Sequence, residues 1–85
     1  MEKKYKLTDE IININGITLY RIEALEDFSD VKKGEKGGFV QSEDNLSQDG
    51  TCWVYDDAIV YGDAQVNSNA KIYSQLHTNK LVGLS

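Results

Sequence analysis

A six-residue repeat in the second half of this 85-residue chain restricts what the chain can fold into. The stretch "YDDAIVYGDAQVNSNAKIYS" holds alanine at every sixth position and a β-branched residue two positions later: Ala58, Ala64 and Ala70, then Val60, Val66 and Ile72. A period of six matches neither the α-helix nor the simple alternation of a strand. Repetition at a fixed short period is instead typical of proteins that stack small structural units.

Two ladders of side chains extend the repeat in both directions. The first ladder is apolar at every position: Val40, Leu46, Cys52, Ala58, Ala64, Ala70, Leu76 and Val82. The second is apolar in its middle: Ser42, Gln48, Val54, Val60, Val66, Ile72, Thr78 and Leu84. Because residues i and i+2 of a strand share a face, each unit turns a small and a branched side chain inward. The Gly, Ser, Asp or Asn that follows predicts a corner, so the repeat predicts a solenoid.

The residues before the repeat predict a small antiparallel sheet. Asn15-Gly16 separates two alternating apolar runs, which is a strong hairpin signal because both residues tolerate positive φ. We expect strands at about 10–14 and about 17–25, with a helix over about 21–28 as the alternative. Residues 30–40 are rich in glycine and lysine, so we expect a loop that leads into the repeat.

At the repeat, the chain resembles the hexapeptide-repeat proteins of the left-handed β-helix type. The resemblance covers residues 38–84 and implies coils of about 18 residues, each made of three hexapeptides. One departure is that Tyr55, Tyr61 and Tyr73 stand directly after the branched residue, where a small residue is common. A narrower resemblance, carried by "GITLYRIEALEDF" and "GEKGGFVQSEDNLSQDGTCWVYDDAIVYGDA", is to a group of small bacterial and phage-encoded proteins.

These features predict an all-β chain in which a short N-terminal β-hairpin or sheet caps a left-handed parallel β-helix of two to three coils. The handedness comes from the resemblance alone. We expect residues 1–37 to form the leader or cap and residues 38–85 the β-helix, packed as one domain. Uniform coils of about 18 residues would place Val40 on Ala58 and Tyr55 over Tyr73, with Trp53 outward.

The distribution of charge and the cysteine count bear on partners and location. Residues 39–85 carry two Lys or Arg against six Asp or Glu, and the whole chain has a net charge of −5. Nucleic-acid binding requires clustered Lys and Arg, so we expect no nucleic-acid partner. A single cysteine allows no disulfide framework, and no apolar run reaches membrane-spanning length. We therefore expect a cytoplasmic protein with no membrane partner.

Few residues of the chain could carry chemistry. His77 is the only histidine, and acyltransferases among the hexapeptide-repeat proteins use a histidine as general base. No carboxylate neighbours it in sequence, and the recurring aspartates fit solenoid corners as well as they fit a Ca²⁺ site. Cys52 lies on the inward ladder, where it packs as a small apolar side chain. We therefore expect no enzymatic activity, no cofactor and no bound metal.

The outward residues of the repeat form the candidate site. Tyr and Trp are favoured at binding hot spots, and acidic side chains complement a basic protein surface. The candidate partner surface comprises Trp53, Tyr55, Asp56, Asp57, Tyr61, Asp63 and Tyr73. The structural alternative is that these aromatic residues cover the solenoid, pack on the N-terminal hairpin or meet another subunit.

We hypothesise from these features a non-enzymatic protein-binding module. The phage-type resemblance makes it an accessory protein or a host-directed, anti-defence inhibitor that binds a bacterial protein. One alternative is a structural, self-assembling β-helix module with no foreign partner, and a less favoured one is a degenerate acyltransferase-like hexapeptide protein. Because an open solenoid end exposes strand edges, we also expect a homo-oligomer, either a dimer or a trimer.

Overall fold

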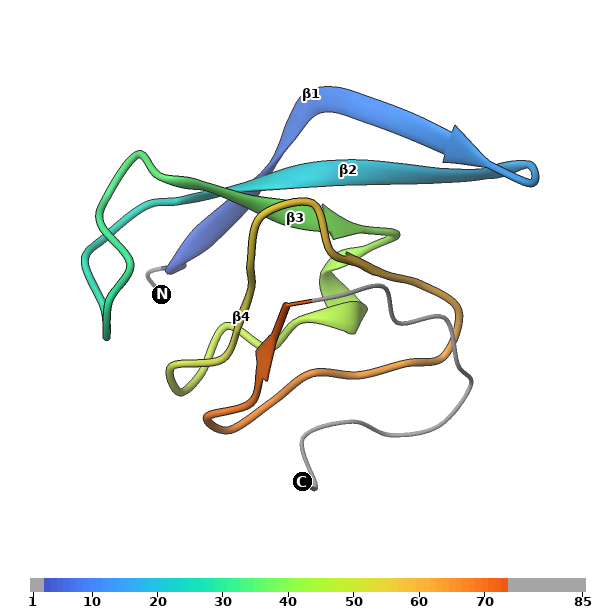
Figure 1. The fold of residues 1–85 in the computed structure, drawn as a ribbon. Coiled ribbons are helices and arrows are strands. Elements are labelled where there is room, and N and C mark those ends of the chain that lie inside the picture. The colour runs from blue at the N-terminus through green and yellow to red at the C-terminus, as the bar shows by residue number, and fades with distance from the viewer. Residues whose placement is uncertain (1–2, 74–85) are drawn as a thin grey trace.

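The computed structural model describes residues 3–73, and this part of the chain is all-β, as predicted (Figure 1). Its elements are β1 (Tyr5–Ile14), β2 (Ile17–Ala24), β3 (Lys36–Val40), a 3₁₀ turn η1 (Glu43–Asn45), β4 (Trp53–Val54), β5 (Ile59–Val60) and β6 (Lys71–Ile72). No helix in the described region is long and apolar enough to cross a membrane. His77 and the last members of both ladders lie outside the described residues.

The strands β1 and β2 form the predicted hairpin. Asn15 and Gly16 make its two-residue turn with φ of 53° and 85°, the left-handed region that both residues tolerate. The strands pair antiparallel, with a bulge in β1 between Leu7 and Ile11. The alternative of a helix over residues 21–28 is wrong, because β2 continues into this stretch and pairs with both β1 and β3.

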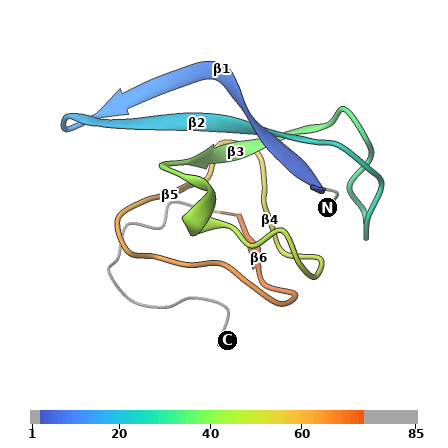
Figure 2. The ribbon, with the colours of Figure 1, turned by 180° about the vertical axis from the view of Figure 1, so that it is seen from behind.

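The strand β3 connects the hairpin to the repeat. It pairs antiparallel with β2 and parallel with β5, which gives one four-stranded sheet in the order β1-β2-β3-β5. The hairpin lies along one side of the repeat in both views (Figures 1 and 2). This contact depends on two glycines. A Cβ on Gly37 would lie 2.5 Å from the carbonyl oxygen of Val54, and one on Gly38 would lie 2.3 Å from that of Ala58.

The repeat follows the same path twice. We call residues 39–58 the first pass and residues 59–73 the second pass. Parallel pairing joins the two passes at five positions: Phe39–Ile59, Val40–Val60, Leu46–Val66, Trp53–Lys71 and Val54–Ile72. Parallel contacts between successive passes are compatible with the coils of a β-helix.

A wider corner in the first pass changes the predicted stacking. Val40 lies beside Val60, not beside Ala58 as uniform coils of about 18 residues require. The offset between paired residues is 20 at Leu46–Val66 and 18 at Trp53–Lys71. Between these two pairs the first pass has residues 47–52, which is two residues more than residues 67–70 of the second pass. The prediction of uniform coils is therefore wrong for the part of the first pass before this corner.

Corners with the predicted residue types recur every six residues. Each is marked by a positive φ, between 55° and 73°, at Gly50, Asp56, Gly62 and Ser68. Backbone hydrogen bonds close the turns that follow, for example from the Ala58 N–H to the Tyr55 carbonyl at 3.0 Å and from the Ala70 N–H to the Asn67 carbonyl at 3.1 Å. The spacing of Gly, Asp and Ser in the sequence thus corresponds to the backbone conformation.

Two apolar clusters stabilise this arrangement. The larger contains the inward ladders together with residues of β1, β2 and the loop before β3: Tyr5, Ile22, Ala24, Val31, Val40, Leu46, Cys52, Trp53, Val54, Tyr55, Ala58, Val60, Ala64 and Val66. The smaller joins the hairpin to β3 and β5 through Leu19, Phe39 and Ile59. Burial of apolar area is the main favourable term in folding, so the N-terminal third and the repeat stabilise each other.

Candidate functional site

Trp53 is buried, which corrects the prediction that it is part of an outward surface. Its side chain is fully inaccessible to solvent. The indole packs edge-on against Tyr5, with ring centroids 6.2 Å apart, and against Phe28 at 5.2 Å. Its N–H has no hydrogen-bond partner among residues 3–73. Trp53 therefore packs the N-terminal third onto the repeat, as the structural alternative proposed.

Tyr55 is also largely covered, although its predicted stacking on Tyr73 is confirmed. The two rings are 4.6 Å apart and inclined by 20°. The Tyr55 hydroxyl donates a hydrogen bond to the Asp30 carboxylate at 2.7 Å and accepts one from the Lys71 ammonium at 3.0 Å. Burial, followed by the nearby Asp30 carboxylate, raises the pKa of the Tyr55 phenol. The same hydrogen bond, assisted by Lys71, lowers the pKa of Asp30.

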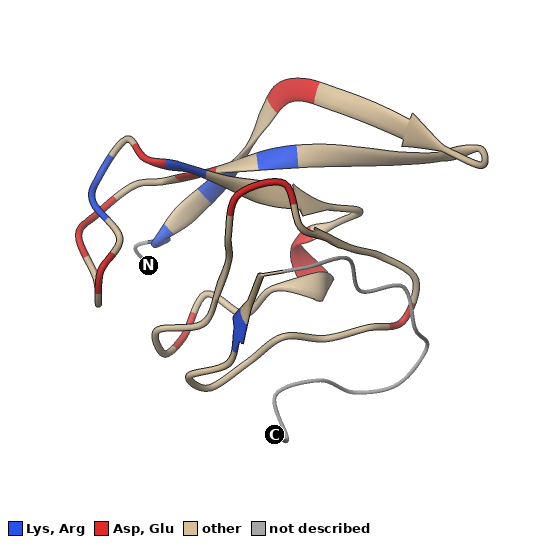
Figure 3. Cartoon of the chain, in the orientation of Figure 1, with Lys and Arg blue, Asp and Glu red and all other residues tan. Residues whose placement is uncertain are grey.

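The other candidate residues lie at two different corners. Asp56 and Asp57 directly follow Tyr55 at an exposed corner, and Tyr73 is 61% exposed beneath it. Tyr61 is half-buried against the smaller apolar cluster, and Asp63 is exposed at the next corner. Acidic residues are spread along the repeat, as Figure 3 shows. Tyr73 thus stacks on the residue that precedes Asp56 and Asp57, whereas Asp63 lies at the following corner.

Arg21 connects the first of these corners to the hairpin. Its guanidinium donates to the Gly37 carbonyl at 2.6 Å and to Asp57 at 3.1 Å, and it forms an ion pair with Glu10 at 2.9 Å. It also lies over the Phe39 ring at 4.2 Å from the centroid. A planar guanidinium can make several directed hydrogen bonds and stack at the same time. Asp57 therefore has a structural partner within the chain.

A polar hollow of about 630 Å³ lies between the two passes and was not predicted from the sequence. It is lined by Gln41, Ser42, Asp44, Asn45, Gly62, Asp63, Ala64 and Gln65. Asn45 is buried, and its amide donates to the carbonyls of Gly62 and Ala64 at 3.2 and 2.7 Å. The sequence feature that could have indicated a buried Asn45 is its spacing from Ser42, with which it forms the capping box of η1. Among residues 3–73, no three His, Cys, Asp or Glu side chains lie in a metal-binding group.

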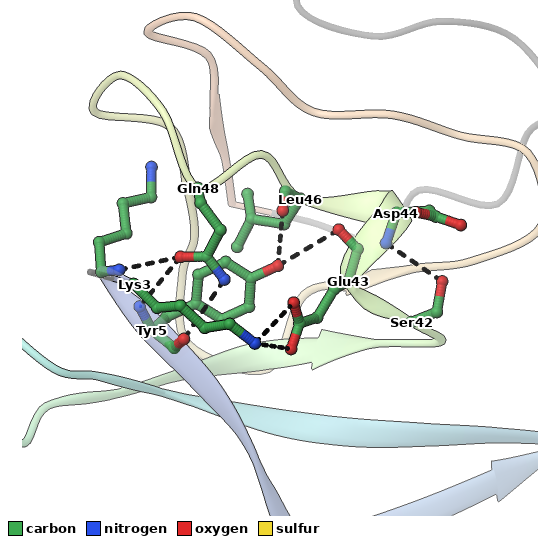
Figure 4. A network of polar contacts seen from close by, with 8 residues as sticks. Lys3, Tyr5, Ser42, Glu43, Asp44, Leu46 and Gln48 are labelled. Atoms are coloured by element: carbon green, nitrogen blue, oxygen red, sulfur yellow. Dashed lines mark hydrogen bonds and ion pairs between the residues drawn. The ribbon is translucent and has the colours of Figure 1, made fainter. Parts of the chain in front are cut away.

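A second unpredicted feature fixes β1 onto the first pass. The Lys4 ammonium is buried and donates to the carbonyls of Asp49, Gly50 and Cys52 at 3.3, 3.0 and 2.9 Å. In Figure 4 the Gln48 side chain faces the Tyr5 backbone and the Tyr5 hydroxyl reaches the Leu46 carbonyl. Burial raises the pKa of the Tyr5 phenol. These contacts are structural, because every polar group in them has a partner within the chain.

Comparison with known proteins changes the functional interpretation. No family model matches the chain. The uncharacterized acetyltransferase YdcK of Escherichia coli (strain K12) is 35% identical over 79 residues, which cover 82% of this chain and 24% of that protein. The chain therefore spans about a quarter of the length of this relative. The similarity contradicts the expectation that the chain is not an enzyme, because a similar protein is named as an acetyltransferase.

Proposed function

We propose that the two passes are coils of a left-handed β-helix and that the chain is a β-helix module of an acetyltransferase-like protein. The observation that carries this proposal is the parallel pairing of the two passes, with positive-φ corners every six residues. The similarity to a protein named as an acetyltransferase supports the second half of it. The hairpin and β3 act as the cap on one side of the stack.

In this proposal the described residues form a rigid support rather than the catalytic group. Transfer of an acetyl group from a thioester to an amine or hydroxyl requires a base that takes the proton of the acceptor. Residues 3–73 contain no histidine, and the one histidine of the chain, His77, follows four residues after the described region. The acceptor oxygen or nitrogen forms a bond to the acetyl carbon while His77 takes its proton, the carbon–sulfur bond breaks with its electron pair on sulfur, and the proton passes from His77 to that sulfur, which leaves as the thiol.

Acetyl-coenzyme A tests this proposal directly. Isothermal titration calorimetry on the full chain should show binding, and a thiol-release assay with small amine and hydroxyl acceptors should show turnover. His77→Ala should reduce thiol release by about 100-fold or more. Thr78→Ala, a neighbouring change that removes no base, should leave it unchanged. The absence of both binding and thiol release in the wild-type chain would contradict the proposed activity.

A second candidate function is binding of another protein at the corner formed by Asp56, Asp57 and Tyr73. Its support is the exposure of these acidic and aromatic side chains, and the phage-type resemblance suggests a bacterial target and a host-directed inhibitor. A pull-down from bacterial lysate should recover a partner with the wild-type chain and lose it with Asp56→Asn/Tyr73→Ala. Recovery of the same proteins by both chains would exclude this corner as the contact.

A further inference from the structure

We propose that the outer edge of β1, over residues 11–14, pairs antiparallel with the same edge of a second copy of the chain. The result is a two-fold dimer in which the two four-stranded sheets become continuous. This inference goes beyond the proposed function and does not depend on acetyl transfer, since it concerns the face of the hairpin away from the repeat. It also names a specific surface for the expected homo-oligomer.

The backbone geometry of β1 leaves hydrogen-bonding groups available at this edge. In the sheet order β1-β2-β3-β5, β1 is a terminal strand. Ile14 and Ile17 flank the two-residue turn, so this pair exchanges backbone hydrogen bonds. Because hydrogen-bonded and non-hydrogen-bonded pairs alternate, the N–H and C=O groups of Ile11 and Asn13 point away from β2. Within the described part of the chain, β1 has no strand on that side.

The two halves of β1 differ in how they protect this edge. Before Ile11 the strand carries a bulge and the exposed charges of Asp9 and Glu10. Bulges and charges are the usual features that prevent edge strands from pairing with other chains. Residues 11–14 contain no charge and no proline, and Ile11 is 54% exposed. This half of the edge is therefore open to pairing.

The charge distribution restricts where a second copy can bind. The chain has a net charge of −5, so two copies repel each other except where they meet through neutral surfaces. Residues 11–20, "IININGITLY", form an uncharged stretch that includes the whole of the open edge. Contact through this stretch keeps the acidic repeats of the two copies on the outer sides of the dimer.

The sequence of the edge is also self-complementary. A two-fold axis at Ile12 places Ile11 of one copy opposite Asn13 of the other, and each such pair exchanges two backbone hydrogen bonds. The two Ile12 side chains then meet on the face of the sheet that carries the smaller apolar cluster. On that face Ile12, Ile14 and Ile17 already pack partly against the smaller apolar cluster. Pairing therefore extends an existing apolar surface.

Size-exclusion chromatography with light scattering tests the proposal on the full chain. The expected mass at high micromolar concentration is twice the 9.5 kDa of one chain. Ile11→Pro removes the outward N–H at a position where an edge strand tolerates proline, so the mass should halve. Ile11→Lys, which adds an edge charge to an exposed side chain, should also halve it. Circular dichroism establishes that each variant is folded.

Thr18→Lys is the matched control. Thr18 lies on β2 opposite Asn13 of β1, so its side chain shares the face of the sheet that carries Ile11 and Asn13 but does not lie on the edge. This variant should remain a dimer. A wild-type chain that stays at the mass of one chain overturns the proposal, as does a dimer that survives both Ile11 changes. Binding of a foreign extended peptide to a monomeric wild-type chain likewise overturns it. If the monomeric Ile11→Lys variant still binds acetyl-coenzyme A, the loss of the dimer is distinguished from a loss of the proposed activity.

Discussion

Single buried polar side chains determine how the N-terminal third attaches to the repeat. The Lys4 ammonium occupies a ring of three carbonyl oxygens at the wide corner of the first pass, and the Phe28 ring lies 5.0 Å from it. A buried charge is tolerated only when its hydrogen-bonding capacity is satisfied, and these carbonyls, together with the Cys52 sulfur at 3.3 Å, supply acceptors for the three donors of the ammonium group. Lys4 thus stabilises the corner that sets the offset between the passes.

Replacing Lys4 by Met should lower the free energy of unfolding by about 2–3 kcal/mol, because the buried Cys52 carbonyl and the two part-buried carbonyls lose their donor. Lys6→Met is the control, since Lys6 is exposed on β1 two residues after Lys4, and its effect should be within about 0.5 kcal/mol. Urea unfolding followed by the fluorescence of Trp53 measures both values. Equal stability of the two variants would show that the carbonyl ring does not hold the ammonium in solution.

Nothing in the sequence marks Lys4 as buried, because lysine is ordinarily a solvated residue. The burial of Trp53 was equally hidden. Because side chains alternate along a strand, Trp53 is expected to point away from the inward ladders. The sequence does not specify which outward-facing side of the repeat the N-terminal third covers. The exposed positions of Asp56, Asp57 and Asp63 did follow from the corner pattern, since these residue types favour turns at the surface.

At the scale of elements, β3 determines the connection between the hairpin and the two passes. It pairs with β2 on one side and β5 on the other, and its glycines lie against the backbone of the first pass. Any side chain at Gly38 would meet the Ala58 carbonyl, which cannot move without disturbing the corner at Asp56. The Gly37-Gly38 pair is therefore a packing requirement of the strand.

Gly38→Ala should destabilise the chain by about 3 kcal/mol through overpacking against backbone. Gly34→Ala is the comparison, because Gly34 has a φ of 90° but open space around its Cβ position. That change should cost only about 1–2 kcal/mol, the penalty of a left-handed conformation. Chemical unfolding of both variants ranks them, and a larger loss at Gly34 would show that the close approach of β3 is wrong.

The sequence predicted some elements better than others. Asn15-Gly16 located the hairpin because its turn has a specific dihedral requirement. The change in the offset between paired residues of the two passes, from 20 to 18, was not predictable from the two ladders of the repeat. Residues two apart share a face, so a slip of two residues exchanges Ala58 for Val60 beside Val40 and keeps an apolar side chain inward. The pattern specifies the inward face of each pass but not its register on the next.

At the scale of the whole molecule, the N-terminal sheet and the two passes form one continuous arrangement. The order β1-β2-β3-β5 carries hydrogen bonding from the hairpin into the second pass, and the larger apolar cluster contains residues from both parts. A proposed dimer through β1 would extend this arrangement on the side away from the repeat. The proposed acetyltransferase-like function assigns the proton transfer to His77, which follows the second pass in the sequence, so that proposal depends on the stacking of the passes and the dimer does not.

The register of the two passes is the central claim, and nuclear Overhauser contacts between backbone protons in the isotope-labelled full chain test it most directly. The structure predicts contacts between Val40 and Val60 and between Trp53 and Lys71, which are parallel neighbours with offsets of 20 and 18. Contacts between Val40 and Ala58, or no contacts between the passes, would contradict it.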